Sequence, residues 1–184
     1  MDDRSLPQLE SKLSEVLISD RAIQARVREL GEQITRDYRD KQPYLVVVLN
    51  GAFLFVADLV RAIDLPLEVG FMAVSSYGDS THSTGSVRIV KDLQKDIYSR
   101  DVLLVEDIVD TGLTISYLRE MLMGRKPASI ATVSLLSKPD ARKVQVPVEY
   151  CGFEIPNKFV VGYGLDYQQR YRNLPCIGVM DPSR

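Results

Sequence analysis

Apolar side chains recur early in the chain at the spacing of one face of a helix. Five of them follow one another at intervals of four, three, four and four residues: Ile23, Val27, Leu30, Ile34 and Tyr38. This spacing predicts an amphipathic helix that packs by its apolar face. Ser19 is a preferred N-cap residue, and Ile18 and Ile23 are placed to form a hydrophobic staple. We therefore expect the helix to begin just after Ser19.

Uninterrupted apolar runs predict the strands of a sheet. The clearest is 44–49, YLVVVL, which is typical of a parallel strand covered on both faces. Further strand-like runs lie at residues 67–77, 87–93, 102–105, 129–136, 148–153, 159–163 and 175–180. Helical patterns at 53–63 and 115–123 stand between strands, and the second stops at Gly124, a residue suited to a C-cap. This alternation indicates an α/β protein with a mostly parallel sheet, and the strand-rich last third predicts a small lobe beside it.

Polar chemistry is concentrated directly after one of these strands. The run 102–105 is followed, in order, by Glu106, Asp107, two apolar residues, Asp110, Thr111, Gly112, Leu113 and Thr114. We expect this cluster to form a strand-to-helix turn, where α/β folds bind phosphates through free backbone N–H groups and the helix dipole. Gly112 lets the backbone approach a ligand closely, and Thr111 and Thr114 add hydroxyl donors.

The three carboxylates of this cluster would repel a phosphate. They are explained if they meet a divalent cation, sugar hydroxyls or a base that must lose a proton. A plainer alternative is a strand that ends in an acidic turn, with Asp110 capping the helix that follows.

Composition narrows the remaining classes of function. A chain of 184 residues fits one domain, residues 1–184, with a sizeable core. The net charge of −2 gives no case for binding nucleic acid or an anionic membrane, and no apolar run approaches the ~20 residues of a membrane span. Cys151 and Cys176 lack CxxC spacing, so we expect reduced core cysteines in a cytoplasmic protein without a signal segment. With His82 as the single histidine, a structural zinc site is not expected.

The segment 102–114 resembles the 5-phosphoribosyl 1-pyrophosphate (PRPP) binding motif of the phosphoribosyltransferases. Four further stretches resemble the hypoxanthine-guanine branch of that family: 48–58 (VLNGAFLFVAD), 75–78 (SSYG), 136–139 (LSKP) and 152–172 (GFEIPNKFVVGYGLDYQQRYR). The resemblance implies the type I phosphoribosyltransferase fold, a mostly parallel sheet flanked by helices with a small C-terminal or hood lobe. It also implies a homodimer or homotetramer that makes IMP or GMP and pyrophosphate from a 6-oxopurine base and PRPP, with Mg²⁺ as cofactor.

The same resemblance assigns roles to the acidic cluster. Glu106 and Asp107 would hold the ribose hydroxyls, directly or through the metal, and the 110–114 turn would hold the 5′-phosphate. Asp110 would be the general base that takes a proton from the purine ring. Lys138 would donate to the 6-oxo group of the base. An ammonium has donors only, so it favours an oxo group over an amino group, and adenine should be a poor substrate. Without the resemblance, Lys138 would be read as a solvated loop charge.

On the pyrophosphate side, the resemblance points to the turn of Asn50 and Gly51, which suits a diphosphate through its backbone N–H groups. The family often carries a basic residue where this chain has Asn50, which weakens any argument from side-chain charge. Ser76 and Tyr77 begin a polar segment, extending to Arg88, that resembles the family's mobile cover. Such a cover would keep water from the reactive sugar carbon. From composition alone, the same segment is an ordinary surface loop.

The last quoted stretch supplies the remaining site residues. Phe159 and Val160 would offer an aromatic face and backbone groups to the base, although Phe159 also fits a core position on a strand. Asp166 would lie near the base and, with Glu106 and Asp107, at the magnesium site. Arg172 would hold the leaving pyrophosphate, because its fork of donors suits phosphate oxygens. On chemistry alone it is a surface charge.

Two other classes share parts of this pattern. A regulator built on the same fold would sense PRPP or nucleotides and bind nucleic acid by another surface, but such relatives tend to lose the catalytic or base-binding residues. Asp110, Lys138, Asp166 and Arg172 are all present here. A ribose-phosphate pyrophosphate synthetase is longer and needs an ATP site, and the chain has no GxxxxGK[ST] or GxGxxG element.

Overall fold

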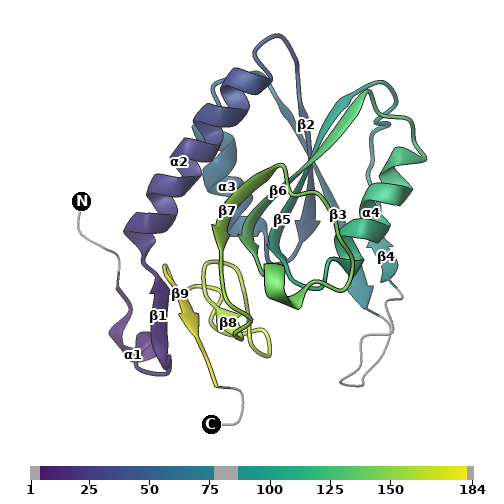
Figure 1. Ribbon diagram of the computed structural model, residues 1–184. Helices are drawn as coiled ribbons and strands as arrows, with labels where there is room; N and C mark the ends of the chain where they lie inside the picture. Colours follow the sequence, from purple (N-terminus) through teal and green to yellow (C-terminus); the bar gives the residue numbers. More distant parts are fainter. Residues whose placement is uncertain (1–4, 77–86, 182–184) are drawn as a thin grey trace.

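The computed structural model describes residues 5–76 and 87–181 (Figure 1). Its elements, in chain order, are α1 (Pro7–Glu10), β1 (Glu15–Ile18), α2 (Asp20–Asp37), β2 (Tyr44–Leu49), α3 (Phe53–Ala62), β3 (Glu68–Ser76), β4 (Val87–Lys91), β5 (Asp101–Val109), α4 (Leu113–Met123), β6 (Ser129–Ser137), the 3₁₀ turn η1 (Pro139–Ala141), β7 (Tyr150–Glu154), β8 (Val160–Val161) and β9 (Ile177–Val179).

Six strands form the main sheet, in the order β4-β3-β2-β5-β6-β7. All neighbouring pairs are parallel except β3 with β4. The expected α/β fold with a mostly parallel sheet is therefore confirmed. Helices α2 and α3 lie on one face of the sheet and α4 on the other (Figure 1). No helix in the described part of the chain is both long and apolar enough to cross a bilayer.

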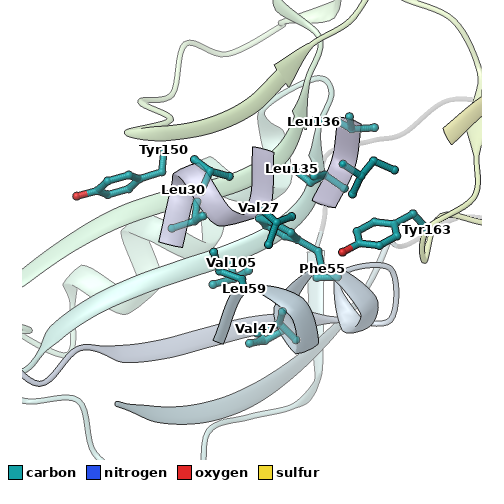
Figure 2. Close-up of a cluster of buried hydrophobic side chains, with 14 of the residues drawn as sticks. Val27, Leu30, Val47, Phe55, Leu59, Val105, Leu135, Leu136, Tyr150 and Tyr163 are labelled. Atoms are coloured by element: carbon teal, nitrogen blue, oxygen red, sulfur yellow. The ribbon is translucent and has the colours of Figure 1, made fainter. Parts of the chain in front are cut away.

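Strand β2 shows why the sheet needs helices on both faces. Leu45 and Val47 pack into the core beneath α2 and α3, whereas Val46 and Val48 pack into the core beneath α4. Because successive side chains of a strand point to opposite faces, an unbroken apolar run must be covered twice. Figure 2 shows the first of these cores, with Val47 of β2 and Leu59 of α3 among its labelled residues.

Helix α2 follows its sequence pattern closely. The Ser19 hydroxyl accepts a hydrogen bond from the Ala22 backbone N–H at 3.3 Å, so the predicted N-cap is confirmed. All five residues of the predicted apolar stripe are buried. Burial of this stripe stabilises the helix more than intrinsic propensity does, since most helical stability in proteins comes from packing of an apolar face.

The prediction of a lobe built from the C-terminal third was partly wrong. Strand β7, from that third, pairs in parallel with β6 and extends the main sheet. The small lobe is a separate sheet, β1-β9-β8, and β1 comes from the N-terminus. Its core joins Val161, Leu174 and Cys176 to Leu9 and Leu13. The short N-terminal elements have too few residues to show a period, so their sequence gave no signal.

Strand β5 is longer than its apolar run predicted. It continues through Glu106 and Asp107 to Val109, because its hydrogen-bonded ladder with β6 extends that far. The expectation that all three carboxylates lie on the turn was therefore wrong for the first two. Helix α4 then begins at Leu113, two residues earlier than its apolar pattern indicated.

Candidate active site

Two strand-to-helix turns lie side by side at one edge of the main sheet. The first, 50–52, joins β2 to α3, and the second, 110–112, joins β5 to α4. Because β2 and β5 are parallel neighbours, both turns follow the carboxyl ends of their strands. Open α/β sheets bind ligands at this edge.

The turn before α4 is shaped for a small anion. Gly112 is the N-cap of α4 with φ of +84°, and a Cβ built there would lie 2.5 Å from the Val144 carbonyl oxygen. Both facts favour glycine at this position. A hollow of about 80 Å³ is lined by residues of β5, the turn and α4, including Glu106, Thr111 and Thr114. The first N–H groups of α4 and its dipole make this hollow suitable for a phosphate.

Asp110 and Lys138 form an ion pair at the mouth of this turn. Lys138 Nζ donates to Asp110 Oδ2 at 2.9 Å. The Lys138 side chain is 7% exposed, against 43% for Asp110. The reading of Lys138 as a solvated loop charge is therefore wrong. Asp110 also does not cap α4, because the N-cap is Gly112 and the first N–H of the helix, that of Leu113, donates to the Thr111 hydroxyl at 3.4 Å.

Glu106 and Asp107 are carboxylates held in a poorly solvated environment. Burial, with the charge of Asp107 beside it, raises the pKa of Glu106 well above its ordinary value. Burial likewise raises the pKa of Asp107 to about 6, although a backbone hydrogen bond from Ile108 and the charge of Arg172 oppose the shift. Glu106 Oε2 is buried and has no hydrogen-bond partner within the described residues. Such groups are suited to a ligand that brings hydroxyl donors or a cation.

The turn before α3 is built from backbone and small residues. The Leu49–Asn50 peptide bond is cis, and the Asn50 side chain is exposed. Gly51 packs so tightly on Asp107 that a Cβ there would overlap the Asp107 carboxylate. Gly164 of the small lobe, with φ of +100°, packs against the Gly51 carbonyl oxygen on the other side. The turn therefore lies between a strand carboxylate and the small lobe.

Arg172 brings positive charge to this side of the site. Its guanidinium pairs with Asp166 at 2.7 Å and donates to the Gly164 carbonyl at 2.7 Å and to Gln169 Oε1 at 2.9 Å. With its side chain 19% exposed, it is not the freely solvated charge that chemistry alone indicated. The electrostatic effects of Arg172 and Asp166 on Asp107 place all three in one neighbourhood.

Phe159 is 42% exposed, so the interpretation of it as a core aromatic is wrong. It meets Tyr167 edge to face, with ring centroids 5.7 Å apart, while its neighbour Val160 is buried in β8. Sequence reasoning did not single out Tyr167, because a tyrosine between a turn and two glutamines carries no periodic signal.

The other predicted site residues have different outcomes. Ser76 ends β3, and Tyr77, like His82 in the polar segment, lies outside the described residues. Among the residues that are described, no three histidine, cysteine, aspartate or glutamate side chains are arranged as a ready-made metal cage. A cation bound here would therefore need oxygens from a substrate besides those of Glu106, Asp107 or Asp166, which is how Mg²⁺ commonly binds.

Comparison with known proteins identifies the family. The family model for the phosphoribosyl transferase domain matches residues 17–168. The hypoxanthine-guanine phosphoribosyltransferase of Bacillus subtilis is 53% identical over 171 residues, covering 93% of this chain and 95% of the relative. That of Mycobacterium tuberculosis H37Rv is 55% identical over 176 residues, covering 92% and 87%.

A solved structure gives the same result. The hypoxanthine phosphoribosyltransferase of Staphylococcus aureus superposes with a TM-score of 0.93 at 45% identity, and the match covers 98% of each chain. The fold, the double turn at the sheet edge and these similarities agree. The chain belongs to the phosphoribosyltransferase family, in its hypoxanthine-guanine branch of purine-salvage transferases.

Proposed function

We propose that this protein transfers the 5-phosphoribosyl group of PRPP to hypoxanthine or guanine, giving IMP or GMP and releasing pyrophosphate. The observation that carries the proposal is the Asp110–Lys138 pair, which places a carboxylate and an ammonium 2.9 Å apart beside an anion-binding turn. A 6-oxopurine offers complementary groups on one edge, since its O6 accepts and an adjacent N7–H donates.

The two residues of the pair have different proposed roles in binding the base. Lys138 is buried and donates to O6, while the more exposed Asp110 accepts the N7 proton as N9 attacks C1 of the ribose. When the base binds, the Asp110–Lys138 contact is replaced by two hydrogen bonds to the base, one donated by Lys138 and one accepted by Asp110. Adenine has an amino donor in place of O6, so it would leave the buried ammonium without an acceptor. Phe159 and the backbone of Val160 contact the ring from the small lobe.

The ribose and its phosphate occupy the turn before α4. The backbone N–H groups of 111–114, with the Thr111 and Thr114 hydroxyls, bind the 5′-phosphate. Glu106 and Asp107 accept hydrogen bonds from the ribose hydroxyls, which accounts for the unpartnered Glu106 oxygen. The two carboxyl groups also fit Mg²⁺, which would be held by Glu106, Asp107 and Asp166 together with substrate oxygens. When bound, the cation would offset negative charge on the leaving pyrophosphate.

The pyrophosphate lies over the other turn. The backbone of Asn50 and Gly51 contacts it, and Arg172 supplies a fork of donors across the gap. Asp166 and Gln169 hold that guanidinium in place. Ser76 ends β3, and the segment that follows it in the sequence would supply the cover that excludes water from C1. All these groups come from the main sheet and the small lobe of a single domain, 1–184.

A direct assay tests the proposal. The purified protein is incubated with PRPP, Mg²⁺ and each of five nucleobases, and nucleotide and pyrophosphate are measured together. We expect stoichiometric IMP or GMP and pyrophosphate from 6-oxopurines and very little product from adenine. PRPP or nucleotide binding without turnover, in protein whose Asp110→Asn variant behaves identically, would instead identify a nucleotide-sensing regulator.

A further inference from the structure

Arg142 has an unusual position beside the phosphate turn. It follows η1, and its Nη2 donates to the Ser137 hydroxyl at 2.9 Å. Its other terminal nitrogen, Nη1, is buried and has no hydrogen-bond partner within the part of the chain that the structure describes. A Cβ built on Gly112 would lie 3.5 Å from this nitrogen, so the guanidinium lies against the turn itself.

The whole segment 138–144 wraps around this turn. Its first residue, Lys138, donates to the Asp110 carboxylate, and its last residues, Lys143 and Val144, donate their backbone N–H groups to the Thr111 carbonyl at 2.9 and 3.2 Å. Two charged side chains lie between these anchors, Asp140 and Arg142, and Arg142 is the cation. A buried guanidinium donor is costly to leave without an acceptor, so the arrangement calls for a nearby negative charge when the site is filled.

We propose that Arg142 is a positioning residue for the 5′-phosphate: it supports the 110–114 turn and supplies positive charge to a doubly ionised phosphate bound there. The inference rests on the proposed function, because it assumes that this turn holds the ribose phosphate. Burial lowers the pKa of Arg142 and the charge of Asp110 opposes that shift. The guanidinium nevertheless stays charged, as arginines do in proteins. Since its position is defined by the turn and not by the base, its influence should be specific to phosphate-bearing ligands.

The test compares wild-type protein with Arg142→Met and Arg142→Lys, with Arg125→Met as the matched control. Arg125 is a partly buried arginine beyond the far end of α4, where it pairs with Asp92. Calorimetry measures IMP affinity, kinetics give KM for PRPP and for hypoxanthine, and ³¹P NMR follows the ionisation of bound IMP. Methionine keeps much of the apolar stem but removes the charge, whereas lysine keeps the charge without the fork.

We expect Arg142→Met to weaken IMP binding and raise KM for PRPP by roughly tenfold, with KM for hypoxanthine within about twofold. The pKa of the bound phosphate, ordinarily about 6, should rise by up to about one unit because the dianion loses a nearby positive charge. Arg142→Lys should recover part of each change, and Arg125→Met should match the wild type. A role in folding alone would not shift the ionisation of the ligand.

Ser137→Ala provides a second test if the methionine variant does not fold. It removes the acceptor that orients the guanidinium, so it should give a smaller loss with the same preference for phosphate-bearing ligands. Unchanged IMP affinity and phosphate ionisation, or equal losses for hypoxanthine and IMP, would overturn the inference while leaving the transferase activity established. Wild-type protein that binds neither IMP nor PRPP would overturn the proposed function and the inference together.

Discussion

The two turns of the active site start from neighbouring parallel strands, yet they are stabilised by different parts of the molecule. The turn before α4 is held within the main sheet, because the Thr111 carbonyl accepts two N–H groups from the segment after β6. The turn before α3 lies between Asp107 of β5 and Gly164 of the small lobe. The first turn is thus held by the segment that links β6 to β7, whereas the second also contacts the small lobe.

The adjacent carboxylates of β5 divide between these turns. Glu106 lines the hollow before α4, and Asp107 touches Gly51 of the other turn. The alternation of side chains along a strand explains this split. One strand therefore connects the two turns, which is what the proposed substrate, with a phosphate at one end and a pyrophosphate at the other, requires.

The largest effect is expected from Asp110→Asn, at the start of the turn before α4. Asparagine keeps the size and much of the hydrogen bonding but cannot take a proton. We predict that kcat falls by on the order of 10²–10⁴ while PRPP affinity changes little. Pre-steady-state kinetics with hypoxanthine and PRPP checks the prediction, and wild-type turnover would reduce Asp110 to a partner for Lys138.

Lys138→Gln should sharpen the distinction between base recognition and phosphate recognition. If Lys138 donates to O6 as proposed, the loss of this charge-assisted bond should cost roughly 1.5–3 kcal/mol, so affinity for 6-oxopurines should fall by about ten- to one-hundred-fold. The 2.9 Å pair with Asp110 is lost as well, so kcat should also decrease. PRPP affinity, measured by calorimetry, should stay nearly constant. A fall in PRPP affinity without a fall in base affinity would make Lys138 a phosphate ligand.

How far the sequence predicts this site differs between the same two regions. The 110–114 turn could be located because an apolar strand, a glycine and a helix pattern are contiguous. The burial of Lys138 and the position of the Arg142 guanidinium could not be predicted. Both depend on the segment 138–144, which folds back onto the turn after β5. Arg142 stands next to another cation, Lys143, and such a pair is ordinarily solvated. The packing of Gly164 on Gly51 joins residues over one hundred positions apart, which no local pattern encodes.

Asp107→Asn tests the cost of preparing the site for a ligand. The folded-state pKa of about 6 lies above the ordinary value of 3.8, so the carboxylate is destabilising once the unfolded chain ionises. The wild type should lose stability relative to this variant as pH rises from about 4 to 6, and the difference should then stay constant. We expect the variant to be more stable at pH 7.5 by roughly 1–3 kcal/mol, and less active.

Urea unfolding of both proteins at pH 3.5, 5 and 7.5, without ligand, measures this difference. The difference should be smallest at pH 3.5, where the carboxyl is protonated in the folded state and mostly protonated in the unfolded state. A variant less stable than the wild type at pH 7.5 would mean that Asp107 contributes more through contacts with its neighbours than it costs by burial.

Gly112→Ala and Gly51→Ala, taken as a pair, test whether the two turns are separate sites. Alanine at 112 must adopt a left-handed conformation and meets the Val144 carbonyl, at a cost of roughly 1–2 kcal/mol in shaping the turn. Alanine at 51 displaces the Asp107 carboxylate. Gly112→Ala should therefore reduce IMP affinity about tenfold and leave pyrophosphate affinity nearly unchanged. Gly51→Ala should reduce pyrophosphate affinity more than IMP affinity. Both substitutions should reduce affinity for PRPP, because the proposed binding mode spans the two turns. Calorimetric titration of each ligand gives these ratios, and equal losses in both variants would show that the turns form one coupled site.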